Sequence, residues 1–149
     1  MNFCLLANIH RILFAGTNTY LCMCWLRAIG GGWTTPTRMH EASILPCLFG
    51  CSDAKDEYRH YITCPMLRQL AKEALNMRES NCEVGHRLCL TACNLNRLKL
   101  LGYCHLLYHS LRKESGCFDS NGDLRPSRPS KIVQQRASDL VRALVSLIE

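Results

Sequence analysis

The feature that most constrains the fold of this 149-residue sequence is the segment CLFGCSDAKDEYRHYITCP at residues 47–65. It holds three cysteines and one histidine: Cys47, Cys51, His60 and Cys64. Zinc takes four thiolate or imidazole ligands in a tetrahedron, and short cysteine spacings followed by a histidine-containing pair are typical of its sites. The segment therefore predicts that one bound metal ion clips a loop to the rest of the chain.

Local spacing supports this ligand set. Gly50 lies between the first two cysteines and lets the chain turn sharply enough for both sulfurs to face one point. His60 and Cys64 are four residues apart, so on a helical turn they share one face. The polar residues 52–59 join the two pairs and favour a surface loop. Because four protein ligands leave no open coordination position, we expect one structural Zn²⁺ and not a catalytic ion.

The alternative is a group of inert thiols, because free cysteines are among the most buried residue types and act as small hydrophobes. The polar character of residues 47–64 argues against it. The chain has eleven cysteines, an odd number that does not suit a fully paired disulfide scaffold. No signal peptide is evident, so we expect a reduced intracellular protein, nuclear or cytoplasmic, in which clustered cysteines favour metal over disulfides.

Leucine is abundant and β-branched runs are scarce, which favours helices. The predicted fold class is mainly α: a small helical domain with one irregular zinc-clipped loop. Residues 3–29 are apolar but interrupted by His10 and Arg11, so we expect buried helices and no membrane span. Composition then divides the chain into apolar N-terminal helices at 1–32, a zinc-binding helical domain at 33–113 with helices over 65–78 and 83–113, a linker at 114–130, and a C-terminal amphipathic helix at 131–149.

The run GGWTTPTRMHEASILPCLFGCSDAKDEYRHYITCPMLRQL resembles the zinc-binding region that follows the polymerase in reverse transcriptases of LINE-type (non-LTR) retrotransposons. The later YCHLLYHSLRK is similar to a helix found downstream in such open reading frames. The resemblance covers residues 33–113 at most. The residues that carry it are Trp33, Arg38, Cys47, Cys51, the loop Asp53–Glu57, His60, Cys64 and Pro65.

This resemblance implies a non-catalytic appendage of a larger enzyme that handles RNA or DNA. The adjacent aspartates of a polymerase are missing from the sequence, and no set of residues suits nuclease chemistry. We therefore expect neither enzymatic activity nor a small-molecule substrate. Met1 falls where the middle of such a protein would be, which leaves open a fragment or a retroelement remnant without a selected function.

A formal net charge of +6 permits weak affinity for nucleic acid. Acidic residues lie among the basic ones, so a solvated mixed-charge surface is the competing interpretation. A second hypothesis is a protein-interaction module, in which the apolar face of the 131–149 helix docks on a partner or a second copy. The candidate nucleic-acid contacts near the zinc ligands are Trp33, Arg38, Lys55, Arg59, Arg68 and Lys72.

Two further Cys/His groups have spacings that raise the question of metal binding. Cys82, His86, Cys89 and Cys93 spread over roughly 16 Å if they lie on one helix, which is too far to converge on one ion. His105 and His109 face the same way, and packed histidines are the usual outcome at such a spacing. The sequence favours structural roles for both groups and leaves metal binding open.

Overall fold

The structure, a computed structural model, describes residues 19–40, 45–78, 83–91 and 94–113, together with Gln135 and Asp139. In these ranges the chain is mainly helical, which confirms the predicted fold class. Most of the predicted N-terminal helices, the linker at 114–130 and nearly all of the 131–149 helix lie outside the described residues. The helices are α2 (Thr19–Ile29), α3 (Pro36–Met39), α4 (Tyr58–Thr63), α5 (Pro65–Ala74), α6 (Val84–Arg87) and α7 (Leu95–Lys113).

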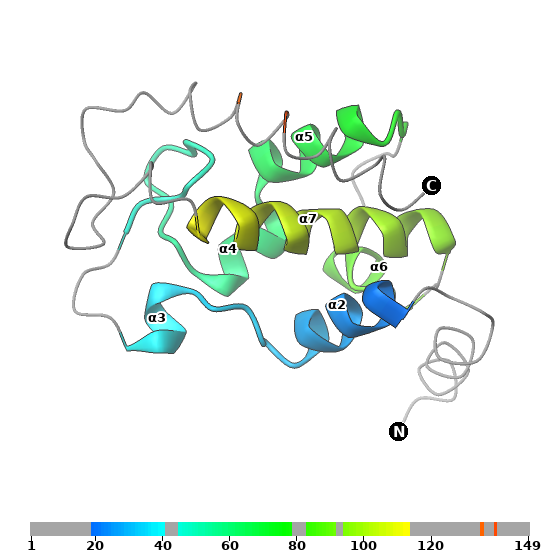
Figure 1. The fold of residues 1–149 in the computed structure, drawn as a ribbon, viewed down its shortest axis with the longest axis horizontal. Coiled ribbons are helices and arrows are strands. Elements are labelled where there is room, and N and C mark those ends of the chain that lie inside the picture. Colours follow the sequence, from blue (N-terminus) through cyan, green and yellow to red (C-terminus); the bar gives the residue numbers. More distant parts are fainter. Residues whose placement is uncertain are drawn as a thin grey trace.

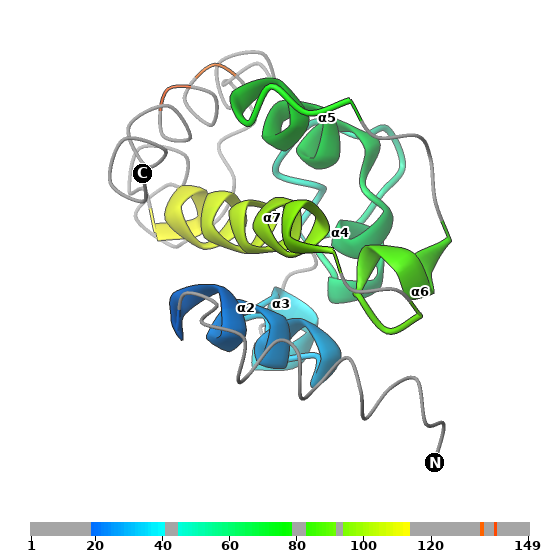
Figure 2. The same ribbon diagram turned by 90° about the vertical axis from the view of Figure 1, so that its right-hand side faces the viewer.

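Helix α7 forms the centre of the described domain, with α5 packed on one side and α2 on the other (Figures 1 and 2). Leu107 and Leu111 of α7 belong to a core shared with α5 and the cysteine loop. Leu98 and Leu101 belong to a second core shared with α2. A helix that is apolar on more than one face must be covered on more than one face. The leucine-rich sequence of α7 therefore explains its central position.

The close approach of α2 to α7 depends on Gly102, because a Cβ atom added there would lie 2.5 Å from Leu21 Cδ2. Leu21 is itself only 3% exposed and has little room to move. We expect Gly102→Ala to lower the free energy of unfolding by about 1–3 kcal/mol through overpacking, partly offset by the better helix propensity of alanine. Urea unfolding followed by circular dichroism measures the change.

The exposed position Asn96 on the same helix supplies a control, since Asn96→Ala should stay within about 0.5 kcal/mol of the parent. Adding Leu21→Ala to Gly102→Ala tests the mechanism. If the contact with Leu21 is the cause, the double variant will be more stable than the sum of the two single effects. Simple additivity would contradict this account.

The prediction of one helical region over 83–113 is wrong in the middle. The structure has two helices there, because α6 ends at Arg87 and α7 begins at Leu95. Cys89 adopts a left-handed backbone with φ 56°, and the Leu90 amide donates to the Gly85 carbonyl at 2.8 Å. This is the hydrogen-bond pattern that closes helices. Asn94 Oδ1 then accepts from the Asn96 amide at 2.8 Å, which caps the start of α7.

The predicted 65–78 helix is also shorter than expected and ends at Ala74. Asn76 has φ 50°, and the Met77 amide reaches back to the Lys72 carbonyl at 2.9 Å. Neither this end nor that of α6 uses glycine in the left-handed position, so the usual sequence signal was missing.

In the described part of the chain, no helix combines the length and the apolar character that crossing a bilayer requires.

Candidate metal centre

A hairpin-like loop presents the first two cysteines. The Cys47 amide donates to the Ala54 carbonyl at 2.8 Å, and the Asp56 amide donates to the Leu45 carbonyl at 2.8 Å. At its tip, Gly50 has φ 78° and its amide donates to the Cys47 carbonyl at 3.1 Å. This left-handed position suits glycine. The predicted sharp turn at Gly50 is therefore confirmed.

The other two ligand candidates come from the junction of two helices. His60 lies in α4, and Cys64 follows α4 and caps α5, whose first residue is Pro65. The Leu67 amide donates to Cys64 Sγ at 3.4 Å. The predicted start of the helix at Pro65 is thus confirmed, and it places the Cys64 sulfur over free amides of the first turn.

The ligand atoms of Cys47, Cys51, His60 and Cys64 all lie within 4.8 Å of one another. Cys64 Sγ is 3.9 Å from Cys47 Sγ and 3.5 Å from Cys51 Sγ, and His60 Nε2 is 3.1 Å from Cys47 Sγ. Metal–sulfur bonds of about 2.3 Å in a tetrahedron separate the sulfurs by about 3.8 Å. The predicted group is therefore brought together with spacings that can hold a metal ion.

Backbone amides surround the sulfurs of this site. Cys47 accepts hydrogen bonds from the amides of Phe49 and Cys51, and Cys51 accepts one from the amide of Met66. Such bonds stabilise the thiolate, which is the form that binds metal. The loop and the start of α5 thus supply amide donors to a ligand set of three sulfurs and one nitrogen.

The three thiols share their protons unequally. A hydrogen bond from the Cys64 thiol, together with those from nearby amides and His60, lowers the pKa of Cys47 to about 5. Burial of Cys47 acts in the opposite direction but is outweighed. The hydrogen bond to Cys47, together with burial, raises the pKa of Cys64. The positive end of α5 favours a thiolate at Cys64, but a buried neighbour of one thiolate keeps its own proton. A bound divalent cation would supply the charge that lets all three ionise.

Trp33, predicted as a nucleic-acid contact, lies in the core with 0% exposure. Its ring stacks on Tyr61 at 6.1 Å and on Tyr108 at 5.3 Å. The Tyr61 hydroxyl accepts from the Leu48 amide at 3.2 Å. A base cannot reach the indole ring there, so its observed role is to join the cysteine loop to α7.

Sequence reasoning missed Asp56 as a site residue, because Asp56 falls in the polar stretch 52–59 that predicts a surface loop. Its exposure is 0%. It accepts from the Tyr108 hydroxyl at 2.8 Å and from Arg112 Nη1 at 2.9 Å. Burial raises its pKa to about 6, although both partners favour the charged form. This pair attaches the end of the loop 45–56 to α7, and no local sequence signal identifies it.

The basic residues predicted to contact nucleic acid lie on several elements. Arg38 on α3, Lys55 in the loop and Arg59 on α4 are exposed, and Arg68 and Lys72 lie one turn apart on α5 with half-buried side chains. Lys55 lies shortly before α4, and Arg59 directly precedes His60 within it. Arg38 lies elsewhere, at a pocket between α2 and α7. Of the five basic residues, only Arg38 lines this pocket.

The other Cys/His groups do not gather metal ligands in the part of the chain that is described, where the Cys47 group alone has three or more. Cys82 and Cys93 lie outside the described residues. His105 Nδ1 lies 3.4 Å from Cys24 Sγ, and His109 Nδ1 lies 3.1 Å from Thr34 Oγ1. These two histidines are packed and hydrogen-bonded, as the sequence favours.

His105 gives the stability a pH dependence of known sign. Burial, with nearby His109 and Arg27, lowers its pKa from an ordinary 6.5 to about 3. Between these values the unfolded chain binds a proton that the folded chain does not, so stability falls as the pH is lowered from 6.5 toward 3. In urea unfolding at pH 7.5 and 4.5, His105→Gln should therefore lose less stability than the parent. Metal release affects both proteins alike, and equal losses would contradict the prediction.

The ligand set decides which chemistry the centre can support. Three sulfurs and one imidazole suit a thiophilic divalent cation, and with all four positions taken by protein no place remains for a substrate. No protein-family model, curated protein or solved structure matches this chain. The functional proposal is therefore built on the geometry of the site.

Proposed function

We propose that Cys47, Cys51, His60 and Cys64 bind one structural Zn²⁺. The observation that carries the proposal is the convergence of their four ligand atoms within 4.8 Å. Zinc is the default for a tetrahedral set of thiolates and imidazole, because it has no redox chemistry and accepts this geometry. Elemental analysis of protein exchanged into metal-free buffer should find about one zinc per chain.

The proposed role of the ion is to fix the loop 45–56 against the junction of α4 and α5. Trp33 and Asp56 then connect that loop to α7 through Tyr108 and Arg112. This supports a non-catalytic module in which the metal holds a surface in place.

We propose that the surface held in place by the metal binds RNA or DNA, as the resemblance to the region after the LINE-type polymerase implies. Among the described residues, twelve Lys and Arg residues outnumber six Asp and Glu residues two to one. Asp56 is buried against Arg112 and adds no negative charge to the surface. Lys55 and Arg59 are exposed beside the metal ligands and suit contacts to phosphates.

Fluorescence anisotropy with labelled single-stranded RNA and DNA at several salt concentrations tests this proposal. We expect the affinity to fall linearly with salt on logarithmic axes, and Arg59→Gln to reduce the slope by about one. Arg78→Gln, an exposed arginine outside the predicted set, is the control. Absent or salt-insensitive binding would contradict nucleic-acid recognition and leave the zinc assignment untouched.

A second candidate function is protein interaction, which one observation favours. Helix α2 carries a row of half-exposed apolar side chains spaced three residues apart: Tyr20, Met23, Leu26 and Ile29. Apolar docking through such a row would be insensitive to salt, unlike phosphate binding. Sedimentation at low and high salt separates the two functions. The 131–149 helix, which the sequence predicts for this role, lies outside the described residues except for Gln135 and Asp139.

A further inference from the structure

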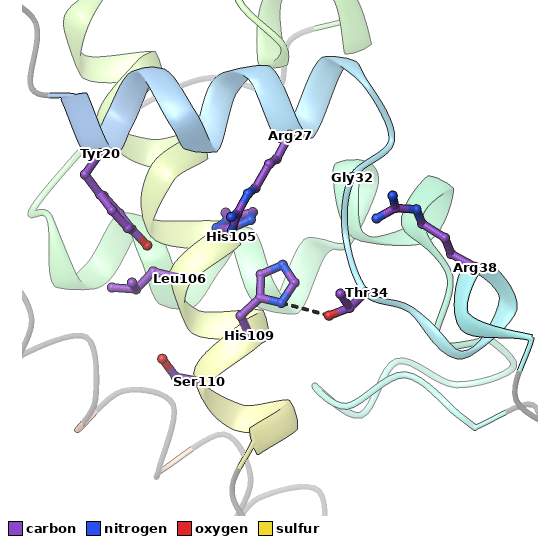
Figure 3. A pocket seen from close by; sticks show the side chains of 9 residues that line it. All are labelled: Tyr20, Arg27, Gly32, Thr34, Arg38, His105, Leu106, His109 and Ser110. Carbon is purple, nitrogen blue, oxygen red and sulfur yellow. Dashed lines mark hydrogen bonds between the residues drawn. The ribbon is translucent and has the colours of Figure 1, made fainter.

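A pocket of about 620 Å³ opens between α2, the segment after it and α7 (Figure 3). Its polar lining includes Arg27, Arg38, Thr34, His105, His109 and Ser110. No acidic side chain is among the described residues that line it. None of the four metal-ligand candidates belongs to it either, so the pocket is independent of the metal centre.

Two arginines supply positive charge to this pocket from different elements. Arg27 extends from α2 beside His105, and Arg38 extends from α3 (Figure 3). Arginine stays charged across the pH range in which proteins fold, and its planar group pairs with two oxygens of a phosphate or carboxylate at once. Charge of one sign without acidic side chains in the described lining favours an anionic ligand.

His105 provides the second, independent indication of a ligand. It is only 3% exposed, and its Nε2 has no hydrogen-bond partner in the structure. Its Nδ1 lies 3.4 Å from Cys24 Sγ. A buried ring nitrogen without a partner is costly, and in the tautomer that carries its hydrogen on Nε2 this atom would donate to a ligand in the pocket.

Hydroxyl groups complete a set of donors around the same space. Thr34 Oγ1 is 3.1 Å from His109 Nδ1, and Ser110 lies one residue further along α7. Two guanidinium groups, an imidazole N–H and hydroxyls are the groups that recognise a tetrahedral oxyanion. We propose that this pocket binds a phosphate group between Arg27, Arg38 and His105, carried by a small phosphate monoester or by the end of a nucleic-acid strand.

The size of the pocket fits more than the phosphate alone. Its volume of about 620 Å³ lies in the range of sites for small organic ligands, roughly 300–1,000 Å³. Tyr20 and Leu106 also line it and offer apolar surface to the group that carries the phosphate. A phosphate monoester is therefore expected to bind more tightly than inorganic phosphate.

Isothermal titration calorimetry at low salt tests the proposal on the whole chain. The probes are inorganic phosphate, a nucleoside 5′-monophosphate with its unphosphorylated nucleoside, and an oligonucleotide with a 5′-phosphate or a 5′-hydroxyl. We expect the monophosphate to bind and the nucleoside not to bind. Arg27→Gln and Arg38→Gln should each weaken binding roughly 10- to 100-fold, the loss typical of one charge-assisted contact. Arg78→Gln, away from the pocket, should not change it.

The oligonucleotide pair identifies the source of the phosphate. Tighter binding of the 5′-phosphate form that is lost in Arg38→Gln assigns a strand end, and equal binding of both forms assigns a small monoester. Both arginines are exposed, so the variants should fold, which circular dichroism verifies. No phosphate-dependent binding, or equal weakening by Arg78→Gln, would overturn the proposal. Either result is independent of zinc content, so the two proposals fail separately.

Discussion

Cys64→Ser is expected to abolish stoichiometric metal binding and to cause the largest loss of stability among single substitutions in this chain. Cys64 is 0% exposed, and its sulfur lies 3.5 Å from Cys51 Sγ and 3.9 Å from Cys47 Sγ. Structural zinc contributes about 10–16 kcal/mol of apparent binding free energy in small zinc domains, and that energy is coupled to folding. Elemental analysis and thermal unfolding with and without a chelator measure both effects.

The matched control is Cys104→Ser, another buried cysteine at 6% exposure that lies outside the metal group. This variant should keep about one metal ion per chain and lose only the modest stability expected when a hydroxyl replaces a buried thiol. If the parent folds without metal and both variants are equally destabilised, the four residues are inert thiols and a histidine. A second metal ion per chain would instead implicate the group that includes His86 and Cys89.

Trp33→Ala is expected to lower the free energy of unfolding by about 3–5 kcal/mol, as is usual when a buried aromatic ring is truncated. The side chain is fully buried and packs against both Tyr61 and Tyr108. Its removal leaves a cavity where the cysteine loop meets α7. Urea unfolding followed by circular dichroism, which does not depend on the lost tryptophan, measures the change.

Trp33→Phe is the comparison for this prediction, because phenylalanine fills much of the space and keeps an aromatic face toward Tyr108. It should recover a large part of the lost stability. If Trp33→Ala instead kept normal stability and lost nucleic-acid binding, the indole would act at the surface. That result would contradict the buried position of Trp33.

The loop of the metal centre is attached to the rest of the domain at a second point. The loop that carries Cys47 and Cys51 also carries Asp56, whose carboxylate pairs with Arg112 near the end of α7. Loss of the metal should therefore loosen one end of the loop while the Asp56 pair still holds the other. A buried ion pair is costly to break once formed, because one charge is left without its partner.

The sequence by itself determined the ligand group and its local geometry. Cys47, Cys51, His60 and Cys64 lie close together along the chain, and a glycine turn, a four-residue spacing and a helix start at Pro65 are short-range features. The helical fold class followed from composition in the same way. Resemblance to the region after the LINE-type polymerase, with its nucleic-acid function, stays a prediction.

Tertiary structure alone decided which polar and aromatic residues are buried. Trp33 and Asp56 sit in polar stretches of sequence, yet both contact Tyr108, which is far away along the chain. The ends of α5 and α6 use Asn76 and Cys89 in left-handed conformations, for which the sequence gives only weak signals. The pocket of Arg27, Arg38 and His105 forms only because α2 packs on α7. Local patterns specify turns and helix faces, whereas contacts between distant segments depend on how the helices pack.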